Sequence, residues 1–421
     1  MRRKGANTGR NRGDKFSFGL GERAVEYRVL LALVVVQGFT WFLVFPLMPL
    51  HASALGASAA IVGFLMAFPA VFQVLICLPA GLLVRRLGER GVFLVSFTLG
   101  VAAAGTYYMA QNVTHLFLGQ MLFGASHAVF WPALTSYLGD LGRELPEGAG
   151  SLISFALGLN AVSYLAGPPL AGYLMDHADP RYVFVIYLVA GVVGLERCRL
   201  LAAGGGRRVP TPAGTGSGGE FRSLFAIPTF RFAVLGTWCS FASWGALDAL
   251  FPLHVSALGY GASSLGFMLT LRSLVIVGCR FSAARFGDLI GFRKVGLLGL
   301  ALCGFSLVAM SVTASPVVLV LASSLAGAAP GFLPVANITL LAAALSDHDR
   351  PLGMAVNELF VGMGRLMGSS ASGVVGATLG MAQGLGGAGV VLLSVTGLLT
   401  YLSSPGVEGS MTRSARGRQG P

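Results

Sequence analysis

Four ionisable side chains fall inside long apolar runs of the sequence. Asp248 and Arg272 lie in two successive runs, and Glu358 and Arg365 lie seven residues apart in a later one. A charge in such a setting is costly unless it pairs with an opposite charge or has a functional role. We expect Asp248 to pair with Arg272 across a helical hairpin. Glu358 and Arg365 are two helical turns apart, so they should face the same side and pair with each other or with a neighbour.

Two interpretations of these four charges stay open at this point. In the first, the ion pairs only hold helices together. In the second, one acid carries a proton and one arginine holds an anionic group of a solute. Glu358 is then the first choice for the proton carrier, and Asp248 is the second.

Uncharged polar and aromatic residues in neighbouring runs are further candidates for a solute path. Trp41, Trp131 and Trp244 could pack against an aromatic or lipophilic solute, although tryptophans in apolar runs commonly serve in packing or at the membrane interface. For His127 a buried, hydrogen-bonded structural role is favoured over lining the solute path. The uncharged polar candidates are Gln120, His127, Asn160 and Asn357.

The sequence offers no cluster suited to a metal, a cofactor or catalysis. Its five cysteines do not pair at metal or redox spacing, and four of them lie inside apolar runs. It has no phosphate-binding loop of the nucleotide-hydrolysing type. Two short polar segments with Asp and His, 176–179 and 347–349, fit connectors between helices. We therefore expect no metal, no cofactor and no enzymatic site, and any solute movement must be driven by an ion gradient or by the solute gradient itself.

Membrane-spanning helices must position these residues. Of the 421 residues 54% are hydrophobic and only 11% are charged, and the mean hydropathy is +0.75, whereas a soluble domain carries roughly 25% charged residues. A helix of about 20 apolar residues crosses the hydrocarbon core. The sequence predicts an all-α polytopic membrane protein of twelve spans, the sixth of which is interrupted by Glu196 and Arg197. The predicted spans are 29–50, 59–84, 91–110, 114–138, 151–174, 182–200, 230–252, 262–284, 294–314, 316–345, 352–378 and 387–403.

Basic residues set the predicted orientation. With the N-terminus inside, 26 of the 29 Lys and Arg residues fall on the inner side, and this bias is typical of cytoplasmic loops. The net charge of +12 therefore indicates topology rather than nucleic-acid binding. Both termini are predicted to be cytoplasmic, in a multi-pass protein of the plasma or inner membrane. The predicted parts are a cytoplasmic segment 1–28, six-helix halves 29–200 and 230–403, a flexible Gly- and Pro-rich cytoplasmic linker 201–229, and a cytoplasmic tail 404–421.

The two halves repeat each other at an offset of 203 residues. Pro49-Leu50-His51 recurs as Pro252-Leu253-His254, and Ser53-Ala54-Leu55-Gly56 recurs as Ser256-Ala257-Leu258-Gly259. Two parallel six-helix repeats can rock about a central site, so that the site opens to each side of the membrane in turn. Further matches at the same offset are Gly63-Phe64 with Gly266-Phe267, Gly88 with Gly291, Arg90 with Arg293, and Gly124 with Gly327.

On these features the chain resembles the major facilitator superfamily over residues 28–403. That family carries the pattern G-x-x-x-D-x-x-G-x-[RK] between spans 2 and 3, at the inner gate. The corresponding segment here is 81–90, in which Arg85 stands where the family has its acid; the second-half copy, 284–293, keeps the acid as Asp288. The resemblance implies a latch at the inner gate, where plain topological charge is the alternative explanation. The residues that match or replace the pattern are Gly81, Arg85, Gly88, Arg90, Asp288, Gly291 and Arg293.

A second segment resembles the antiporter motif of the family's exporters. In span 5 the sequence Gly167-Pro168-Pro169-Leu170-Ala171-Gly172 is similar to the G-P-x-x-G-G core, with Ala171 in place of one glycine. Proline bends a helix and glycine permits close packing, so this segment is expected to seal or hinge the site. In span 4, Gln120 stands where proton-coupled exporters of the family often carry an arginine, so any proton must use other groups.

The resemblance therefore implies a secondary active transporter that works by alternating access, an exporter of drug or metabolite type that is coupled to protons. An importer of a sugar, an organic acid or a similar solute is the alternative, and a polytopic membrane enzyme is a third possibility. The expected partners are a small-molecule substrate, the lipid bilayer and protons, with no nucleic acid, and the expected state is a monomer.

Overall fold

The computed structural model describes residues 10–141, 148–201, 222–346 and 349–402. Within these ranges every regular element is a helix. The first half contains α1 (Arg10–Val44), η1 (Phe45–Leu47), α2 (Met48–Ala54), α3 (Ala59–Tyr108), α4 (Val113–Leu141), α5 (Gly148–Ser163), α6 (Gly167–His177) and α7 (Arg181–Cys198). The second half contains α9 (Pro228–Ala257), α10 (Ala262–Ile290), α11 (Phe292–Ser311), α12 (Pro316–Ala326), α13 (Ala328–Ala344), α14 (Arg350–Thr378) and α15 (Met381–Leu402).

The helices coincide with the predicted spans. Seven helical segments in the described ranges are long and apolar enough to cross a membrane: Val25–Ala54, Ala59–Ile76, Arg86–Tyr108, Ala262–Ile290, Phe292–Ser311, Pro316–Ala344 and Met381–Tyr401. The other five predicted spans correspond to α4, to α5 with α6, to α7, to α9 and to α14. The interrupted sixth span is helical through Glu196, which forms an exposed ion pair with Arg199 at 3.0 Å near the end of α7.

Glycine and proline account for the breaks within spans. The fifth span divides into α5 and α6 directly before Gly167 and Pro168, because proline lacks an N–H and clashes with the preceding turn. The predicted division between spans 2 and 3 is present, but the connection is tighter than the expected loop. The segment α3, Ala59–Tyr108, consists of two helices joined across a kink at Gly88, where φ is +69°. That angle suits glycine because the residue has no Cβ.

The internal repeat is visible in the backbone. Gly56 and Gly259 both adopt φ of +85°, and Gly88 and Gly291 both adopt positive φ. Two other glycines a repeat apart form matching close contacts: a Cβ on Gly124 would meet the backbone of Pro69, and a Cβ on Gly327 would meet the backbone of Arg272. The repeat offset relates Pro69 to Arg272 as well, so the two halves fold alike and pack alike.

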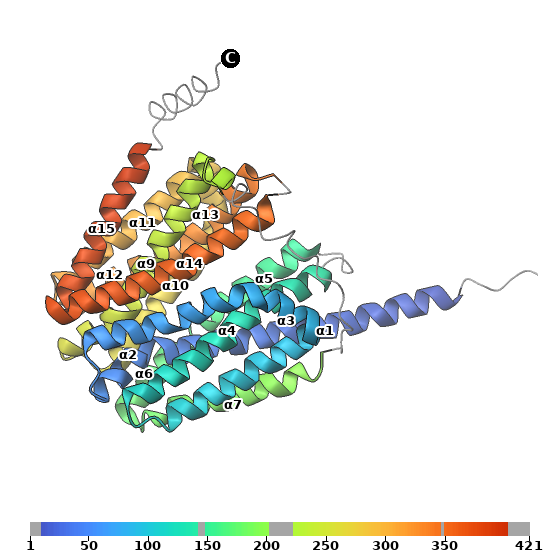
Figure 1. Ribbon diagram of the computed structural model, residues 1–421, viewed down its shortest axis with the longest axis horizontal. Helices are drawn as coiled ribbons and strands as arrows, with labels where there is room; N and C mark the ends of the chain where they lie inside the picture. Colours follow the sequence, from blue (N-terminus) through green and yellow to red (C-terminus); the bar gives the residue numbers. More distant parts are fainter. Residues whose placement is uncertain (1–9, 142–147, 202–221, 347–348, 403–421) are drawn as a thin grey trace, which may run out of the picture.

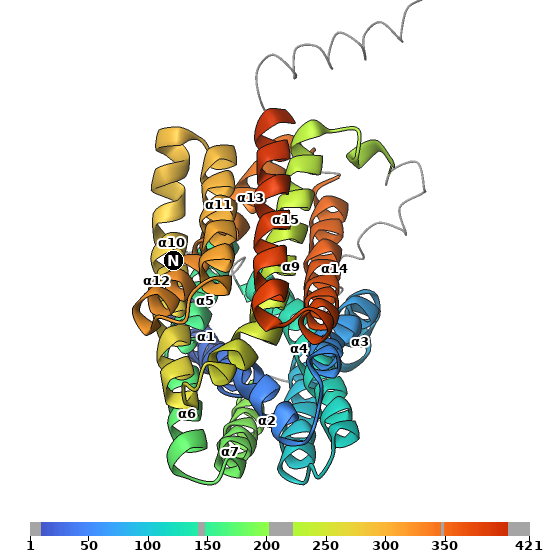
Figure 2. The ribbon, with the colours of Figure 1, turned by 90° about the vertical axis from the view of Figure 1, so that its left-hand side faces the viewer.

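The two halves are pressed together at one end of the molecule. There a Cβ on Gly63 of α3 would lie 2.7 Å from Cα of Gly373 in α14, and a Cβ on Gly172 of α6 would lie 2.3 Å from the carbonyl oxygen of Ala262 in α10. Only glycine permits this backbone approach. We call this the closed end. The opposite end, where α5 and α14 begin, is called the open end, because the blue-to-green half and the yellow-to-red half diverge towards it (Figures 1 and 2).

Candidate functional site

A buried arginine lies where the two halves meet. Arg365 of α14 is 8% exposed, and its guanidinium carbon lies over the rings of Trp41, Phe45, Phe241 and Trp244 at 5.1, 5.9, 5.7 and 5.1 Å. Two of these rings come from the first half and two from the second. We call the four rings the aromatic cage. Cation–π attraction holds the guanidinium there, yet among the described residues none accepts a hydrogen bond from it or pairs with its charge.

The aromatic cage is built on the internal repeat. Trp41 and Trp244 are 203 residues apart, the repeat offset, and each lies 5.1 Å from the Arg365 guanidinium carbon. The sequence therefore held a signal that its analysis missed: two tryptophans at equivalent positions point towards one pseudo-symmetric centre. Phe45 and Phe241 were not singled out from the sequence. Trp131, the third tryptophan considered there, packs against Phe130 and lies outside the cage.

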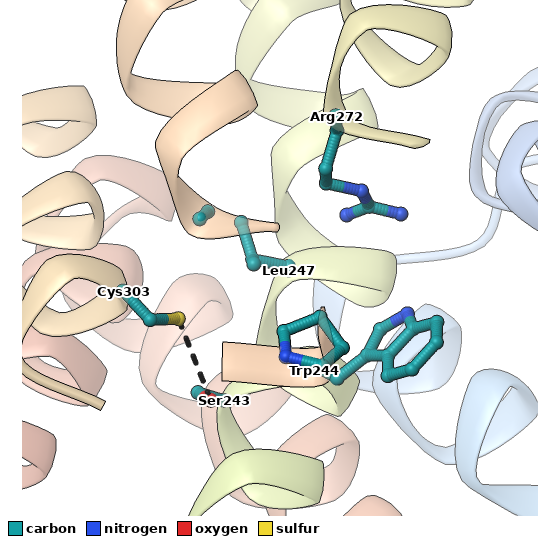
Figure 3. Close-up of a pocket in the computed structure, with 7 residues that line it drawn as sticks. Ser243, Trp244, Leu247, Arg272 and Cys303 are labelled. Atoms are coloured by element: carbon teal, nitrogen blue, oxygen red, sulfur yellow. Dashed lines mark hydrogen bonds between the residues drawn. The ribbon is translucent and has the colours of Figure 1, made fainter. Parts of the chain in front are cut away.

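Asp248 and Arg272 form the predicted ion pair. Asp248 Oδ1 lies 3.2 Å from Arg272 Nη2, and both side chains are 4% exposed. Arg365 is also near enough to Asp248 to act on its charge. Beside the pair, Cys303 donates to Ser243 Oγ at 3.7 Å across a crevice that also borders Trp244 and is too narrow for a water molecule. Figure 3 shows Arg272 and Cys303 on opposite sides of this crevice.

The predicted pairing of Glu358 with Arg365 or a neighbour is wrong in this conformation. Glu358 is exposed and makes no ion pair or hydrogen bond with any residue that the structure describes. Seven residues of helix separate the two α-carbons by about 10 Å, which is too far for direct contact. Their shared direction is as predicted. At about 100° per residue Glu358 lies within about 20° of Arg365 and roughly opposite Met367 and Val374, which are 49% and 43% exposed.

Among the polar candidates of the first half, His127 has a described contact with the aromatic cage. His127 contacts Trp41 with ring centroids 4.5 Å apart, and its Nδ1 is 3.0 Å from the Phe123 carbonyl oxygen. Its Nε2 is buried and has no hydrogen-bond partner in the described residues. Gln120 is fully buried, and both polar atoms of its amide are unpartnered there too. Asn160 instead donates a hydrogen bond to the Tyr164 hydroxyl at 2.8 Å, so part of its hydrogen-bonding capacity is used by a residue one turn further along the chain.

Asn357 belongs to a separate polar cluster inside the second half. Thr237 donates to Asn357 Oδ1 at 2.7 Å, and Asn337 donates to Thr237 Oγ1 at 2.8 Å. Asn337 also donates to the Ala233 carbonyl at 3.0 Å. These bonds tie α9, α13 and α14 together, so the contacts of Asn357 are with its own half. The amide of Asn337 was not recognised from the sequence, because a single Asn in an apolar run shows no spacing that indicates a partner.

The span 5 motif lies at the junction of the two halves. A Cβ on Gly167 would meet the backbone of Phe42 in α1, and a Cβ on Gly172 would meet the backbone of Ala262 in α10. Pro168 faces α10 as well, because its carbonyl oxygen would lie 2.5 Å from a Cβ on Gly266. Ala171, which replaces a glycine of the motif, is fully buried. The segment thus packs α6 against both halves.

At the closed end a carboxylate of the first half accepts hydrogen bonds from the backbone of the second half. Asp176 at the end of α6 accepts hydrogen bonds from the backbone N–H groups of Ala262 and Ser263 at 2.9 and 2.7 Å. These are the first residues of α10, whose own N-cap, Gly261, has no side chain to do this. In the first half the equivalent residue is Ser58, which caps its own helix. Sequence analysis treated Asp176 as part of a connector and missed this contact.

The two copies of the inner-gate pattern make their recorded contacts within their own halves. Arg293 donates to Thr229 Oγ1 at 2.7 Å and lies over the Phe232 ring. Glu89, one residue before Arg90, accepts a hydrogen bond from Ser136 at 3.5 Å. Asp288 is exposed, and no described residue pairs with it. Gly88 and Gly291 supply the turns, whereas the surroundings of Gly81 and Arg85 lie outside what the structure describes.

The described residues contain no group of three or more His, Cys, Asp and Glu side chains that could hold a metal ion. The chemistry available at the junction of the halves is therefore recognition by one uncompensated guanidinium and four aromatic rings, with an exposed carboxylate on the same face of α14.

Comparison with known proteins places these features in context. A sequence profile of the Major Facilitator Superfamily matches residues 30–232 and 233–419. Multidrug resistance protein MdtH of Aeromonas hydrophila is 25% identical over 266 residues, which are 62% of this chain and 64% of that protein. The chain thus spans slightly less than two thirds of that relative's length. Multidrug resistance protein MdtG of Klebsiella pneumoniae is 26% identical over 391 residues, 89% of this chain and 93% of that protein.

A relative of different description and a solved structure complete the comparison. The probable nitrate transporter NarT of Staphylococcus carnosus is 26% identical over 166 residues, 38% of this chain and 42% of that protein. The crystal structure of the nucleoside transporter NupG superposes with a TM-score of 0.73 at 12% identity, and covers 89% of this chain and 99% of NupG. At that identity the match concerns the fold alone.

Proposed function

The chain belongs to the Major Facilitator Superfamily, and from that premise we propose that it exports small amphiphilic molecules across the cell membrane in exchange for protons. It is a multi-pass membrane transporter and not an enzyme. Export is supported by the relatives MdtH and MdtG, which are described as multidrug resistance proteins, and by the antiporter-like segment Gly167–Gly172.

One observation carries the proposal: Arg365 and its aromatic cage lie between the two halves, which are pressed together at the closed end and diverge towards the open end. Trp41 and Phe45 belong to the first half, whereas Phe241, Trp244 and Arg365 belong to the second. A solute bound there touches both halves, so rocking of one half against the other changes the side from which it can leave. If both termini are cytoplasmic, as predicted, the open end faces the cytoplasm. An exporter binds its substrate from that side.

Glu358 is the proposed proton carrier. It is exposed on the open-end part of α14, faces the same direction as Arg365 and has no partner among the described residues. Asp248 suits this role less well, because Arg272 neutralises it at 3.2 Å inside a dry environment. A carboxylate that alternately binds and releases a proton must reach water in at least one conformation, and the exposed side chain of Glu358 is the better placed of the two for this.

Purified protein in liposomes tests the proposal. An exporter that exchanges solute for protons should accumulate a lipophilic solute in vesicles that are acidic inside, because protons leave as solute enters. Glu358→Gln should abolish this gradient-driven accumulation and leave solute exchange intact. Glu196→Gln, which changes an exposed carboxylate paired with Arg199 at the end of α7, is the matched control and should behave as wild type. Full gradient-driven accumulation by Glu358→Gln would remove Glu358 from the mechanism.

Import is the second candidate, and one observation favours it. The relative NarT is described as a probable nitrate transporter, and Arg365 supplies an uncompensated positive charge. An importer would be recognised if intact cells that express the protein gain solute in proportion to its expression, whereas an exporter lowers the cellular content of the same solute.

A further inference from the structure

We propose that Arg365 and its aromatic cage bind an amphiphilic organic anion, whose carboxylate or similar group meets the guanidinium and whose flat apolar part stacks on the tryptophans. This names a substrate class for the proposed transporter and therefore rests on the proposed function.

The charge balance at the junction of the halves is the first argument. Asp248 is the one acid near the cage among the described residues, and Arg272 already binds it at 3.2 Å. Arg365 adds a second guanidinium near the same carboxylate. Glu358 lies about 10 Å along α14 and is exposed. Because arginine stays protonated in proteins, the site carries one positive charge more than its acids balance. A cationic solute would be repelled there, and an anionic solute would restore neutrality.

The unfilled hydrogen-bonding capacity of Arg365 is the second argument. A guanidinium carries five N–H donors in a fork that matches a carboxylate. In the described residues no acceptor receives any of them, and Nε is buried without a partner. The four rings attract the charge of the guanidinium but accept no ordinary hydrogen bond. The side chain is thus held in place and still lacks the acceptor that its geometry fits.

The surroundings indicate the rest of the solute. Trp41 and Trp244 approach Arg365 from opposite halves at the same distance of 5.1 Å, so a flat ring system whose acidic group meets the guanidinium lies within reach of both indole rings. His127 Nε2 and Gln37 Nε2 are buried polar atoms without partners in the described residues. His127 contacts Trp41 directly, and Gln37 lies one turn before Trp41 in α1. Gln37 Nε2 can donate a hydrogen bond to a polar substituent, and His127 Nε2 can accept one, because Nδ1 of the neutral ring donates to the Phe123 carbonyl.

Three naphthalene probes of nearly the same shape separate charge from shape: 2-naphthoate, the neutral 2-naphthamide and the cationic 2-naphthylmethylammonium. Binding to the full-length protein in nanodiscs is measured by isothermal titration calorimetry. The proposal predicts that naphthoate binds about tenfold or more tightly than naphthamide, as expected for a charge-assisted bidentate contact, and that the cation binds most weakly. Arg365→Gln should remove the preference for the anion, and Arg365→Lys should keep part of it, because lysine retains the charge but not the fork.

Controls keep the outcome decisive. Trp131→Phe alters a tryptophan outside the cage and should leave the charge preference unchanged, whereas Trp244→Phe should weaken all three probes. If Arg365→Gln does not fold, the order of the three probes on the wild-type protein still decides. Equal binding of the three probes, or tighter binding of the cation, overturns the inference. Naphthoate binding without proton-driven accumulation would leave the inference standing and contradict the proposed function instead.

Discussion

At the scale of single residues, we infer a structural role for the ion pair between Asp248 and Arg272 and propose a functional role for Glu358. The pair is 4% exposed on both sides and joins α9 to α10. Both charges must lose water on burial, and each compensates the other only as long as both are present. Glu358 is exposed and has no ion-pair or hydrogen-bond partner among the residues that the structure describes, so removing its charge should affect coupling without affecting folding.

This difference gives a stability prediction. Asp248→Asn leaves Arg272 buried without a counter-charge and should destabilise the protein by about 3–5 kcal/mol. The double variant Asp248→Leu with Arg272→Met removes both charges and should recover most of that loss. Thermal unfolding in detergent measures both, with Glu358→Gln as a charge-removal control that should melt as wild type. A double variant as unstable as Asp248→Asn would show that the pair is more than a structural unit.

The residues of the site were predictable to an uneven degree. Asp248 and Arg272 were found as a pair, because two opposite charges in consecutive apolar helices have few other partners. Glu358 and Arg365 were placed on one face of a helix. Helical periodicity shows which way two side chains point but not whether they are close enough to touch, so their proposed pairing was wrong. The aromatic cage was not found because its members come from α1, η1 and α9, and only the three-dimensional fold brings these elements around Arg365.

At the scale of helices, the contact between Asp176 and the start of α10 acts as a clasp at the closed end. The N–H groups of Ala262 and Ser263 carry the partial positive charge of a helix N-terminus, and Asp176 satisfies both. Partial burial on its own would raise the pKa of Asp176, but the hydrogen bonds from Ser263 and Ala262 hold that pKa below the usual carboxylate value. The clasp is thus stabilising at and above the ordinary carboxylate pKa, and it is lost only as the pH falls through the lowered one.

The clasp predicts how the closed end responds to mutation and to pH. Asp176→Ala should weaken closure by about 0.5–2 kcal/mol, the usual cost of losing a helix cap. A cysteine in place of Leu265, which is 1% exposed, should then react faster with a membrane-impermeant maleimide. Asp179→Ala is the control, because Asp179 bonds only within its own turn, to the N–H of Arg181. Closure that changes between pH 6 and 8 in wild type but not in Asp176→Ala would contradict this account, since Asp176 should stay ionised over that range.

Glycine contacts make a second prediction about helices. A methyl group on Gly172 would lie 2.3 Å from the Ala262 carbonyl oxygen, which belongs to the backbone and cannot turn aside. Gly172→Ala should therefore force α6 and α10 apart and expose Leu265 to the same reagent. Gly278→Ala in α10 meets nothing within 4 Å and should have no effect. Unchanged reactivity in Gly172→Ala would mean that the closed end is held by other contacts.

The positions of the helices were largely predictable from the sequence, whereas the kinks and connections between them were harder to predict. Apolar runs locate the spans because each helix needs about 20 such residues to cross the membrane. The division of span 5 before Gly167 follows from Gly-Pro-Pro, which the sequence shows. The continuation of α3 through Arg85 and Arg86 does not, because charged residues suggested a loop and helix propensity favoured a helix.

At the scale of the whole molecule, orientation in the membrane remains a prediction. The Lys and Arg bias places both termini and the linker 201–229 in the cytoplasm. Gly216 lies within that linker and outside the described residues. Gly216→Cys should resist an impermeant maleimide on intact cells and react after permeabilisation, and Asp179→Cys should react from outside. Labelling of Gly216→Cys on intact cells would mean that the open end faces the outside of the cell, and the substrate would then bind from the outside.

The central claim is that the two halves rock about Arg365, so that one end opens as the other closes. Pulsed electron paramagnetic resonance measures the distance between two spin labels at each end of the molecule. The labels are attached to introduced cysteines after the five native cysteines have been replaced. The exposed residues Tyr173 and Phe267 report on the closed end, and Leu87 and Leu289 report on the open end. With 2-naphthoate bound, and on a change from mildly alkaline to mildly acidic buffer, we expect the closed-end distance to lengthen while the open-end distance shortens. Distances that stay fixed, or that lengthen together, would contradict alternating access about this site.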